Sequence, residues 1–95
     1  MSGWVYIVTN APRGTLYIGV TNTLARRAWE HREEVYEGFT KRYRLHRLVW
    51  YEEFPTVPEA IHREKRLKKW SRQWKIELIE GFNPTWEDLY EALNA

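Results

Sequence analysis

The chain has 95 residues, 43% hydrophobic and 29% charged, which is typical of one small globular domain and too apolar for a disordered chain. It contains no cysteine, which excludes disulfides, thiolate nucleophiles and cysteine-ligated metal sites. No apolar run is long enough to cross a bilayer, and the first residues lack the pattern of a secretory signal. We therefore expect a cytoplasmic protein.

The charges are distributed unevenly along the chain, although the formal net charge is only +2. Residues 62–75 carry seven lysines and arginines and a single glutamate, whereas residues 76–95 carry five acidic residues and no basic one. This division indicates one side of the molecule that faces a polyanion. The alternative is that both segments are simply solvated helix faces.

Alternating β-branched and aromatic residues predict an antiparallel hairpin at the start of the chain. We expect strands over residues 4–9 and 16–20, joined by the turn residues of segment 10–15. Gly19, inside the second strand, indicates either the close approach of another group or a bend.

The middle of the chain is predicted to be a helix, an irregular segment and a third strand. The helix covers residues 24–34 and follows capping residues at 21–23. Residues 35–46 are expected to be a loop with a short helix, and the strand covers residues 47–54.

The last part of the chain is predicted to be helical. A helical pattern runs over residues 57–80, with a bend at Ser71 and an end at Gly81. Thr85 and Asp88 resemble a capping box for a last helix over residues 86–93.

This order of elements predicts an α+β domain with a small three-stranded antiparallel sheet flanked by helices. The expected order is β-β-α-α-β-α with additional C-terminal helices, in a single domain over residues 1–95.

Glu64 interrupts the apolar stripe that Val57, Ala60, Ile61 and Leu67 form on one helix. A buried carboxylate needs a partner, because its desolvation is costly. Glu64 therefore either pairs with an arginine or lines a cleft, where it could hold a hard cation such as Mg²⁺. The alternative is a glutamate at the edge of the stripe that reaches water or a salt bridge.

Five other residues are candidates for phosphate chemistry. Arg27 and His31 share one helix face and form either a phosphate-binding pair or part of an exposed basic face. Tyr6 and Tyr17 lie on the paired strands, either as core residues or as a base or nucleophile. Gly19 points to the same face as Tyr17 and would leave room for a backbone or a phosphate.

These residues together resemble the GIY-YIG nuclease superfamily, and in particular its small stand-alone bacterial branch. The superfamily pattern is a GIY-type strand, a YIG strand, an arginine and a histidine four residues apart, and a glutamate on a later helix. The matching positions are Val5-Tyr6-Ile7, Tyr17-Ile18-Gly19, Leu24, Arg27, His31 and Glu64. The chain departs from the pattern at Trp4-Val5-Tyr6, where the glycine of the first motif is replaced.

The resemblance implies a metal-dependent endonuclease. The catalytic residues that it implies are Tyr6, Tyr17, Gly19, Arg27, His31, Glu64 and Asn83. Glu64 would bind one divalent cation, Mg²⁺ or Mn²⁺. Tyr17 would be the general base, with His31 as the alternative base, and Tyr6 would orient the nucleophile. Arg27 would balance charge on the phosphate, and Gly19 would let the phosphate approach.

The resemblance also implies that nucleic acid is the partner, with DNA expected rather than RNA. The residues expected to follow the nucleic-acid backbone are Lys41, Arg42, Arg44, Arg63, Lys65, Lys68, Lys69 and Arg72. We expect a monomer or weak homodimer, with no membrane partner, that repairs or processes branched or damaged DNA. The alternatives are a nucleic-acid-binding module with weak or no catalytic activity, and a protein-interaction domain.

Overall fold

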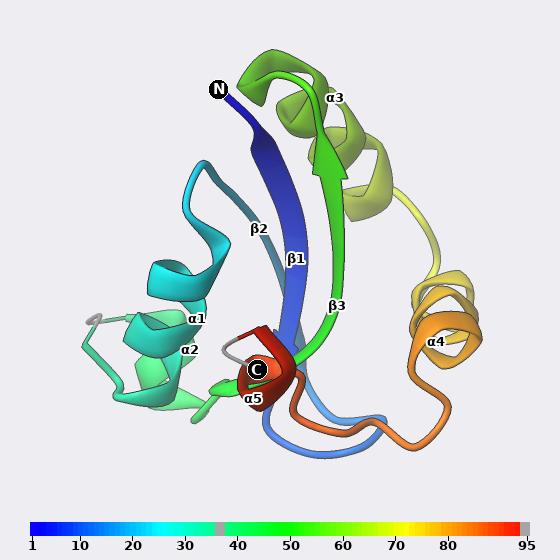
Figure 1. Ribbon diagram of the computed structural model, residues 1–95. Helices are drawn as coiled ribbons and strands as arrows, with labels where there is room; N and C mark the ends of the chain where they lie inside the picture. The colour runs from blue at the N-terminus through cyan, green and yellow to red at the C-terminus, as the bar shows by residue number, and fades with distance from the viewer. Residues whose placement is uncertain (36–37, 94–95) are drawn as a thin grey trace.

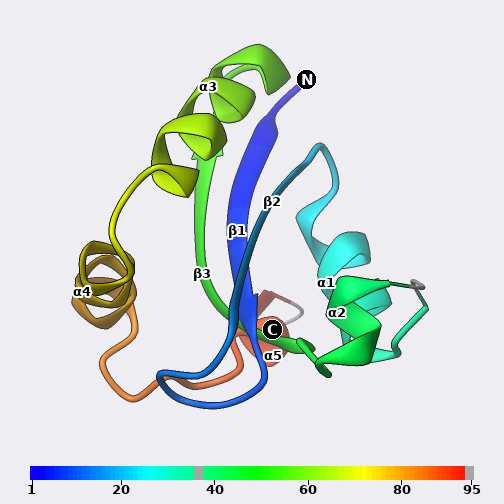
Figure 2. The ribbon, with the colours of Figure 1, turned by 180° about the vertical axis from the view of Figure 1, so that it is seen from behind.

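The computed structural model describes residues 1–35 and 38–93 as an antiparallel sheet packed between helices (Figures 1 and 2). The strands are β1 (Gly3–Thr9), β2 (Leu16–Thr21) and β3 (Arg47–Phe54), in the sheet order β2-β1-β3. The helices are α1 (Leu24–Arg32), α2 (Phe39–Arg42), α3 (Val57–Lys68), α4 (Arg72–Phe82) and α5 (Tyr90–Leu93). The predicted α+β class and the three-stranded antiparallel sheet are confirmed.

The register of the hairpin places the two candidate tyrosines on one face of the sheet. Tyr6 of β1 pairs with Gly19 of β2, and Val8 pairs with Tyr17. Because side chains alternate along a strand, Val5 and the other odd-numbered residues of β1 face the opposite side.

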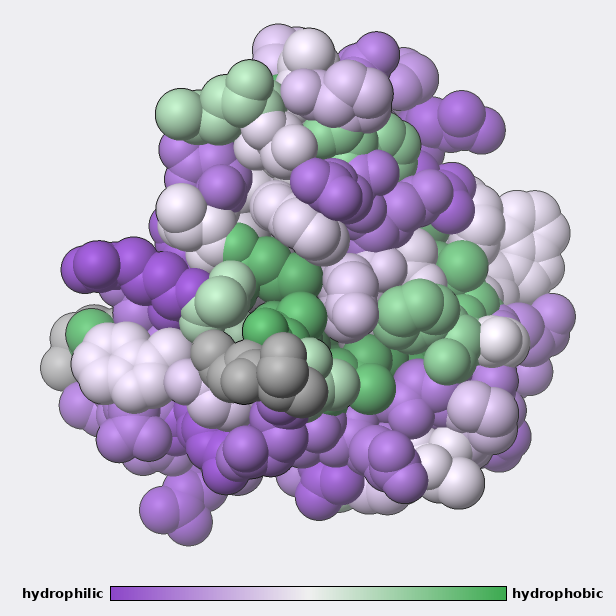
Figure 3. Space-filling view, viewed as in Figure 1, coloured by the Kyte–Doolittle hydropathy of each residue, from purple (hydrophilic) through white to green (hydrophobic). Residues whose placement is uncertain are grey.

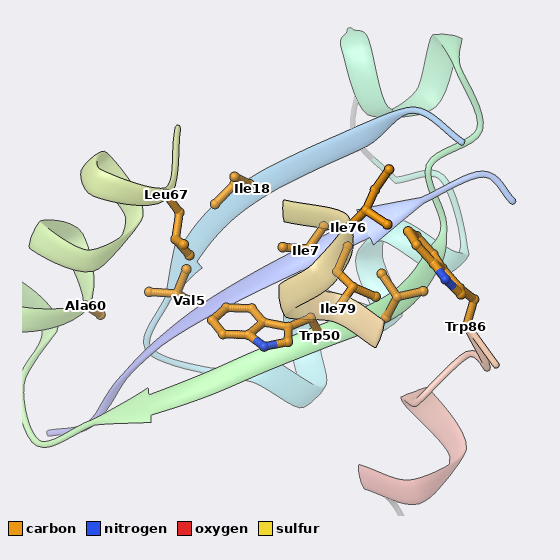
Figure 4. Close-up of a cluster of buried hydrophobic side chains, with 10 residues drawn as sticks. Val5, Ile7, Ile18, Trp50, Ala60, Leu67, Ile76, Ile79 and Trp86 are labelled. Carbon is orange, nitrogen blue, oxygen red and sulfur yellow. The ribbon is translucent and has the colours of Figure 1, made fainter. Parts of the chain in front are cut away.

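One core cluster fills the sheet face that α3 and α4 cover (Figure 4). Its buried residues from the sheet include Val5, Ile7 and Ile18, and α3 contributes Ala60 and Leu67. Figures 1 and 2 show α3 and α4 together on this side. Their apolar stripes are therefore held against the sheet.

A second core cluster lies on the other face, beneath α1. Its members are Tyr6, Val8, Leu24, Ala28, Leu45 and Leu48, with Tyr17 and residues of the C-terminal segment packed against it. Figure 1 shows α1 and α2 on this side, across the sheet from α4. The two faces of β1 thus belong to two separate cores.

The predicted helix over residues 57–80 is two helices, α3 and α4, separated at residues 69–71. The predicted bend at Ser71 lies at this break, where the Ser71 side chain accepts a hydrogen bond from the backbone N–H of Trp74 at 3.1 Å. The predicted end at Gly81 is wrong, because α4 continues to Phe82 and Asn83 is its C-cap.

The last helix begins at Tyr90 instead of residue 86. Trp86 has a φ of 57°, which interrupts a helix at that position. Oδ1 of Asp88 accepts hydrogen bonds from the backbone N–H groups of Leu48 at 3.2 Å and Tyr90 at 3.1 Å. Asp88 therefore ties the segment to β3 instead of completing the predicted capping box.

The first helix is also shorter than predicted, since α1 ends at Arg32 and Glu34 has a φ of 55°. Within residues 1–35 and 38–93, none of the helices has the length and apolar composition needed to span a membrane.

Candidate active site

Tyr6 and His31 form a buried hydrogen-bonded pair between the sheet and α1. The Oη atom of Tyr6 lies 2.9 Å from Nε2 of His31. Tyr6 is 2% exposed and His31 is 5% exposed. Tyr6 comes from the central strand, and His31 comes from the last turn of α1. The fold therefore brings two polar side chains into the middle of the second core cluster.

Gly19 lies directly beneath the ring of Tyr6. A Cβ atom at position 19 would lie 2.5 Å from both Cζ and Oη of Tyr6, which is closer than van der Waals contact allows. The close approach predicted at Gly19 is therefore that of the Tyr6 ring. The approach of a phosphate to this position stays a prediction.

His31 is held neutral at physiological pH. Burial lowers its pKa to about 4, the positive charge of Arg27 adds to the shift, and Glu30 opposes it. A neutral imidazole can donate or accept the hydrogen bond with Tyr6, according to its tautomer. A histidine with so low a pKa is a weak base, and this favours a positioning role.

Arg27 lies one turn before His31 on α1, as the spacing predicted. Its Nε lies 3.5 Å from Oε1 of Glu30, and its side chain is 37% exposed. Glu30 also pairs with Arg26 at 3.5 Å. The Arg27 guanidinium is thus oriented by a neighbouring carboxylate and remains accessible to a phosphate.

Tyr17 is the more exposed of the two tyrosines. It is half-buried, and its ring centroid lies 5.9 Å from that of His31 and 6.4 Å from that of Phe39. Tyr17 is therefore able to contact a molecule outside the core, whereas Tyr6 is covered. Phe39 is not among the residues predicted from the sequence. The signal for it is the segment 39–44, in which two aromatic residues stand among three basic ones.

Glu64 lies on α3, across the sheet from the tyrosines. Its side chain is 14% exposed, and its Oε2 lies 3.1 Å from Nζ of Lys68. The helix neighbours Ala60 and Leu67 belong to the first core cluster, on the face opposite Tyr17. The salt bridge matches one of the alternatives left open by the sequence. The structure does not bring Glu64 onto the tyrosine face.

Glu64 offers one carboxylate as a ligand for a divalent cation, with the Lys68 ammonium beside it. A carboxylate oxygen is a suitable ligand for Mg²⁺, which is commonly held by one or two carboxylates together with water and substrate phosphates. The part of the chain that the structure describes has no group of three acidic, histidine or cysteine side chains arranged to enclose a metal. Glu64 can therefore supply one ligand, and the remaining ligands would come from water and phosphate.

Asn83 is buried and bonded to the main chain. Its Nδ2 donates to the carbonyl oxygens of Val49 at 3.2 Å and Glu87 at 2.8 Å, and its Oδ1 accepts from the N–H of Glu87 at 3.1 Å. These bonds join the end of α4 to β3. They favour a structural role for Asn83, and its catalytic role stays a prediction.

The cations predicted to bind a nucleic-acid backbone lie on two sides of the sheet. Lys41, Arg42 and Arg44 lie in or beside α2, on the tyrosine face, and all three are exposed. The others lie in or between α3 and α4, at positions Arg63, Lys65, Lys68, Lys69 and Arg72. The fold therefore divides the predicted basic residues into two groups.

Three cations of the second group have intramolecular partners, since Lys68 pairs with Glu64 at 3.1 Å. Arg63 pairs with Glu52 at 3.2 Å and lies over the ring of Trp70, and Arg72 donates to the carbonyl oxygens of Arg13 and Gly14. Lys65 and Lys69 are exposed.

A surface hollow of about 490 Å³ lies between β3 and α4. Its lining includes Trp50, Tyr51, Leu78 and Phe82. Figure 3 looks onto the β3 side of the molecule and shows apolar side chains gathered near the middle of the view, with hydrophilic ones around the lower rim. This hollow contains none of the predicted catalytic residues.

Comparison with known proteins gives consistent matches. Residues 2–77 match the family model of the GIY-YIG catalytic domain. A UPF0213 protein from Staphylococcus saprophyticus is 37% identical over 76 residues, which are 80% of this chain and 92% of the relative. A UPF0213 protein from Bacillus pumilus is 35% identical over 75 residues, covering 79% of this chain and 76% of the relative.

A solved structure shares the fold. The solution NMR structure of a UPF0213 protein from Bacillus halodurans matches with a TM-score of 0.57 and 30% sequence identity, covering 93% of each chain. The similarity thus extends beyond the segment that matches the family model.

Proposed function

Because the chain belongs to the family of GIY-YIG catalytic domains, we propose that it is a divalent-metal-dependent endonuclease that hydrolyses phosphodiester bonds in nucleic acid, with DNA as the first substrate to test. The observation that carries this proposal is the cluster of Tyr6, Tyr17 and His31 on one sheet face, with Arg27 one helical turn away. A buried tyrosine–histidine pair beside an accessible arginine and tyrosine is suited to phosphate chemistry.

The proposed site lies at the β2 edge of the sheet. β2 is an edge strand, and Tyr17 belongs to it. Helix α3, which carries Glu64, packs against both β1 and β2 from the other side. Figure 2 shows α1 and α3 on opposite sides of the sheet. A phosphate bound at the edge of β2 would therefore lie between Tyr17 and Glu64.

In the reaction, the oxygen of a water molecule forms a bond to phosphorus while the bond from phosphorus to the leaving oxygen breaks. Tyr17 acts as the general base: it takes the proton of the attacking water and gives its own proton to solvent. The leaving oxygen takes a proton from solvent. Arg27 donates hydrogen bonds to the phosphate oxygens, where negative charge accumulates. His31 holds Tyr6 in place, and both pack beside Tyr17.

Glu64 would hold the metal, which would supply positive charge to the phosphate and to the leaving oxygen. The salt bridge with Lys68 would hold this carboxylate in position until a cation binds. Replacement of Glu64 would therefore remove the metal ligand and leave the tyrosine face intact.

The test is cleavage of labelled DNA and RNA of several structures by the wild type, Glu64→Gln and Glu59→Gln, with Mg²⁺, Mn²⁺ or a chelator. Glu59 is the matched control, because it is an exposed glutamate on the same helix. We expect metal-dependent cleavage by the wild type and Glu59→Gln, and at least a hundredfold loss in Glu64→Gln, on the order of what a lost charge-stabilising group costs.

Two results would contradict the proposal. One is the absence of cleavage on every substrate by a folded wild-type protein that still binds nucleic acid, which would identify a binding module. The other is unchanged cleavage by Glu64→Gln, which would remove Glu64 from the site. Circular dichroism of each variant separates loss of activity from loss of the fold.

A further inference from the structure

A row of aromatic rings leads from the proposed site to the surface of α2. The ring centroid of Tyr17 lies 6.4 Å from that of Phe39, and the Phe39 centroid lies 4.8 Å from that of Tyr43. Phe39 is 49% exposed and Tyr43 is 45% exposed. Large aromatic side chains contribute most when buried, so two adjacent exposed rings are candidates for contact with another molecule.

The short helix α2 presents these rings without being part of the core. It has four residues and none of them is buried. Tyr43 lies four residues after Phe39, and its N–H donates to the Phe39 carbonyl oxygen at 3.1 Å. Both side chains therefore lie on one side of the turn. The chain is anchored just beyond them by Leu45, which is 1% exposed and belongs to the second core cluster. The rings are thus held beside Tyr17 from a fixed position.

Residues 38–46 contain Lys41, Arg42 and Arg44 and no acidic residue, and of these cations Arg44 pairs with Glu34 at 3.5 Å. The guanidinium carbon of Arg42 lies 5.7 Å from the centroid of the Tyr43 ring. Aromatic faces next to cations are suited to a ligand that carries flat rings on an anionic backbone. An unpaired stretch of nucleic acid has both features, whereas a duplex keeps its base faces stacked internally.

We propose that Phe39 and Tyr43 form a stacking surface for unpaired bases of the strand whose phosphate is bound beside Tyr17. The proposal rests on the proposed nuclease function and names its substrate class, which is nucleic acid with unpaired nucleotides next to the bond that is cut. Arg42 and Lys41 would bind the flanking phosphates.

Trp74 offers a comparison on the other side of the sheet. It is 57% exposed on α4, and its ring packs edge-on against Trp70 with centroids 5.6 Å apart. Because α4 packs on the face opposite Tyr17, Trp74 lies away from the proposed site. Trp74→Ala is therefore the matched control for the loss of an exposed aromatic ring.

The test measures binding of labelled oligothymidylate and of a blunt duplex by fluorescence anisotropy, in chelator so that nothing is cut. The variants are Phe39→Leu, Tyr43→Leu, Tyr43→Phe and Trp74→Ala. The leucines keep apolar volume on α2 and remove the aromatic face. We expect each leucine variant to weaken binding of the single strand by about tenfold. Duplex binding should change little, and Tyr43→Phe and Trp74→Ala should bind as the wild type.

The proposal is overturned if folded leucine variants bind the single strand as the wild type does, or if they lose binding of single strand and duplex equally. Its failure is distinct from that of the nuclease function. If the leucine variants bind the single strand normally while the wild type shows metal-dependent cleavage, only the stacking surface is overturned. If the leucine variants lose single-strand binding but the wild type cuts no substrate, the stacking surface stands and the nuclease assignment is overturned.

Discussion

A Cβ atom at position 19 would lie 2.5 Å from the Tyr6 ring, while the Oη of Tyr6 lies 2.9 Å from His31. The absence of a side chain at Gly19 therefore determines where the Tyr6 ring lies. The Tyr6 hydroxyl in turn holds the His31 imidazole through its hydrogen bond. A change at Gly19 would be transmitted to two other residues of the site, although its own side chain has no chemistry.

Gly19→Ala is expected to displace the Tyr6 ring and lengthen the Tyr6–His31 hydrogen bond. Overpacking of a tight core costs about 1–3 kcal/mol in the free energy of unfolding. Gly81→Ala is the control, because a Cβ at that position of α4 meets no atom within 4 Å, and it should stabilise by about 0.5–1 kcal/mol. Urea denaturation measures both values. Equal stability of the two variants would show that the Tyr6 ring moves aside without cost.

His31 makes the stability of the domain depend on pH. Its pKa is lowered from 6.5 to about 4, so the unfolded chain binds more protons between these values. The free energy of unfolding should therefore be unaffected by this group above pH 6.5 and fall by about 3 kcal/mol as the pH drops through 4.

The measurement is urea denaturation across this range for the wild type, His31→Gln and His62→Gln. His62 is an exposed histidine on α3, so its replacement should leave the pH dependence unchanged. His31→Gln should flatten the curve. A wild-type curve that is already flat between pH 6.5 and 4 would show that His31 becomes protonated in the folded protein.

Among the elements, the segment after α4 bonds to main-chain groups near the start of β3. Asn83 and Asp88 bond to Val49 and Leu48, and the N–H of Leu89 donates to the carbonyl oxygen of Leu48 at 2.8 Å. These bonds cap main-chain groups that would otherwise be open to another strand. The segment thus fastens α4 and α5 to the sheet.

Asn83→Ala is expected to destabilise the domain by about 2 kcal/mol, because it leaves the buried carbonyl of Val49 and two part-buried main-chain groups of Glu87 without their partner. Cleavage per folded molecule should stay within about twofold of the wild type. Asn22→Ala is the control, since Asn22 is exposed on the loop after β2. A stable but inactive Asn83→Ala protein would return Asn83 to the catalytic set.

The elements that the sequence predicts well are those set by local patterns. The hairpin follows from two runs rich in β-branched and aromatic residues with a turn between them, and the shared face of Arg27 and His31 follows from helical spacing. The start of α5 is not predictable in this way, because Asp88 is drawn to Leu48, a residue 40 positions earlier. The fit of Tyr6 over Gly19 likewise depends on strand register.

The candidate site could likewise be predicted only in part from the sequence, because contacts between residues far apart in the chain complete it. Spacing indicates that Glu64 lies on an apolar stripe, but it gives no information on which sheet face the stripe covers. The exposure of Phe39 and Tyr43 depends on the four-residue length of α2 and on the anchor at Leu45. Tertiary packing determines both outcomes.

In the molecule as a whole, the proposed chemistry is divided between two faces of one thin sheet. Tyr17 and Arg27 lie with α1 and α2, whereas Glu64 lies on α3 behind β2. A substrate phosphate would have to bind at the β2 edge to be reached from both sides. The two groups of exposed cations would then guide a strand around this edge, since each lies on one side of it.

The most direct measurement of this arrangement is paramagnetic broadening of amide NMR signals by Mn²⁺ in the presence of an oligonucleotide. We expect the strongest broadening at Glu64 and along residues 17–20 of β2, and its loss in Glu64→Gln but not in Glu59→Gln. This result would place one metal between α3 and the Tyr17 strand. Broadening centred elsewhere, or unchanged in Glu64→Gln, would contradict a site shared by the two faces.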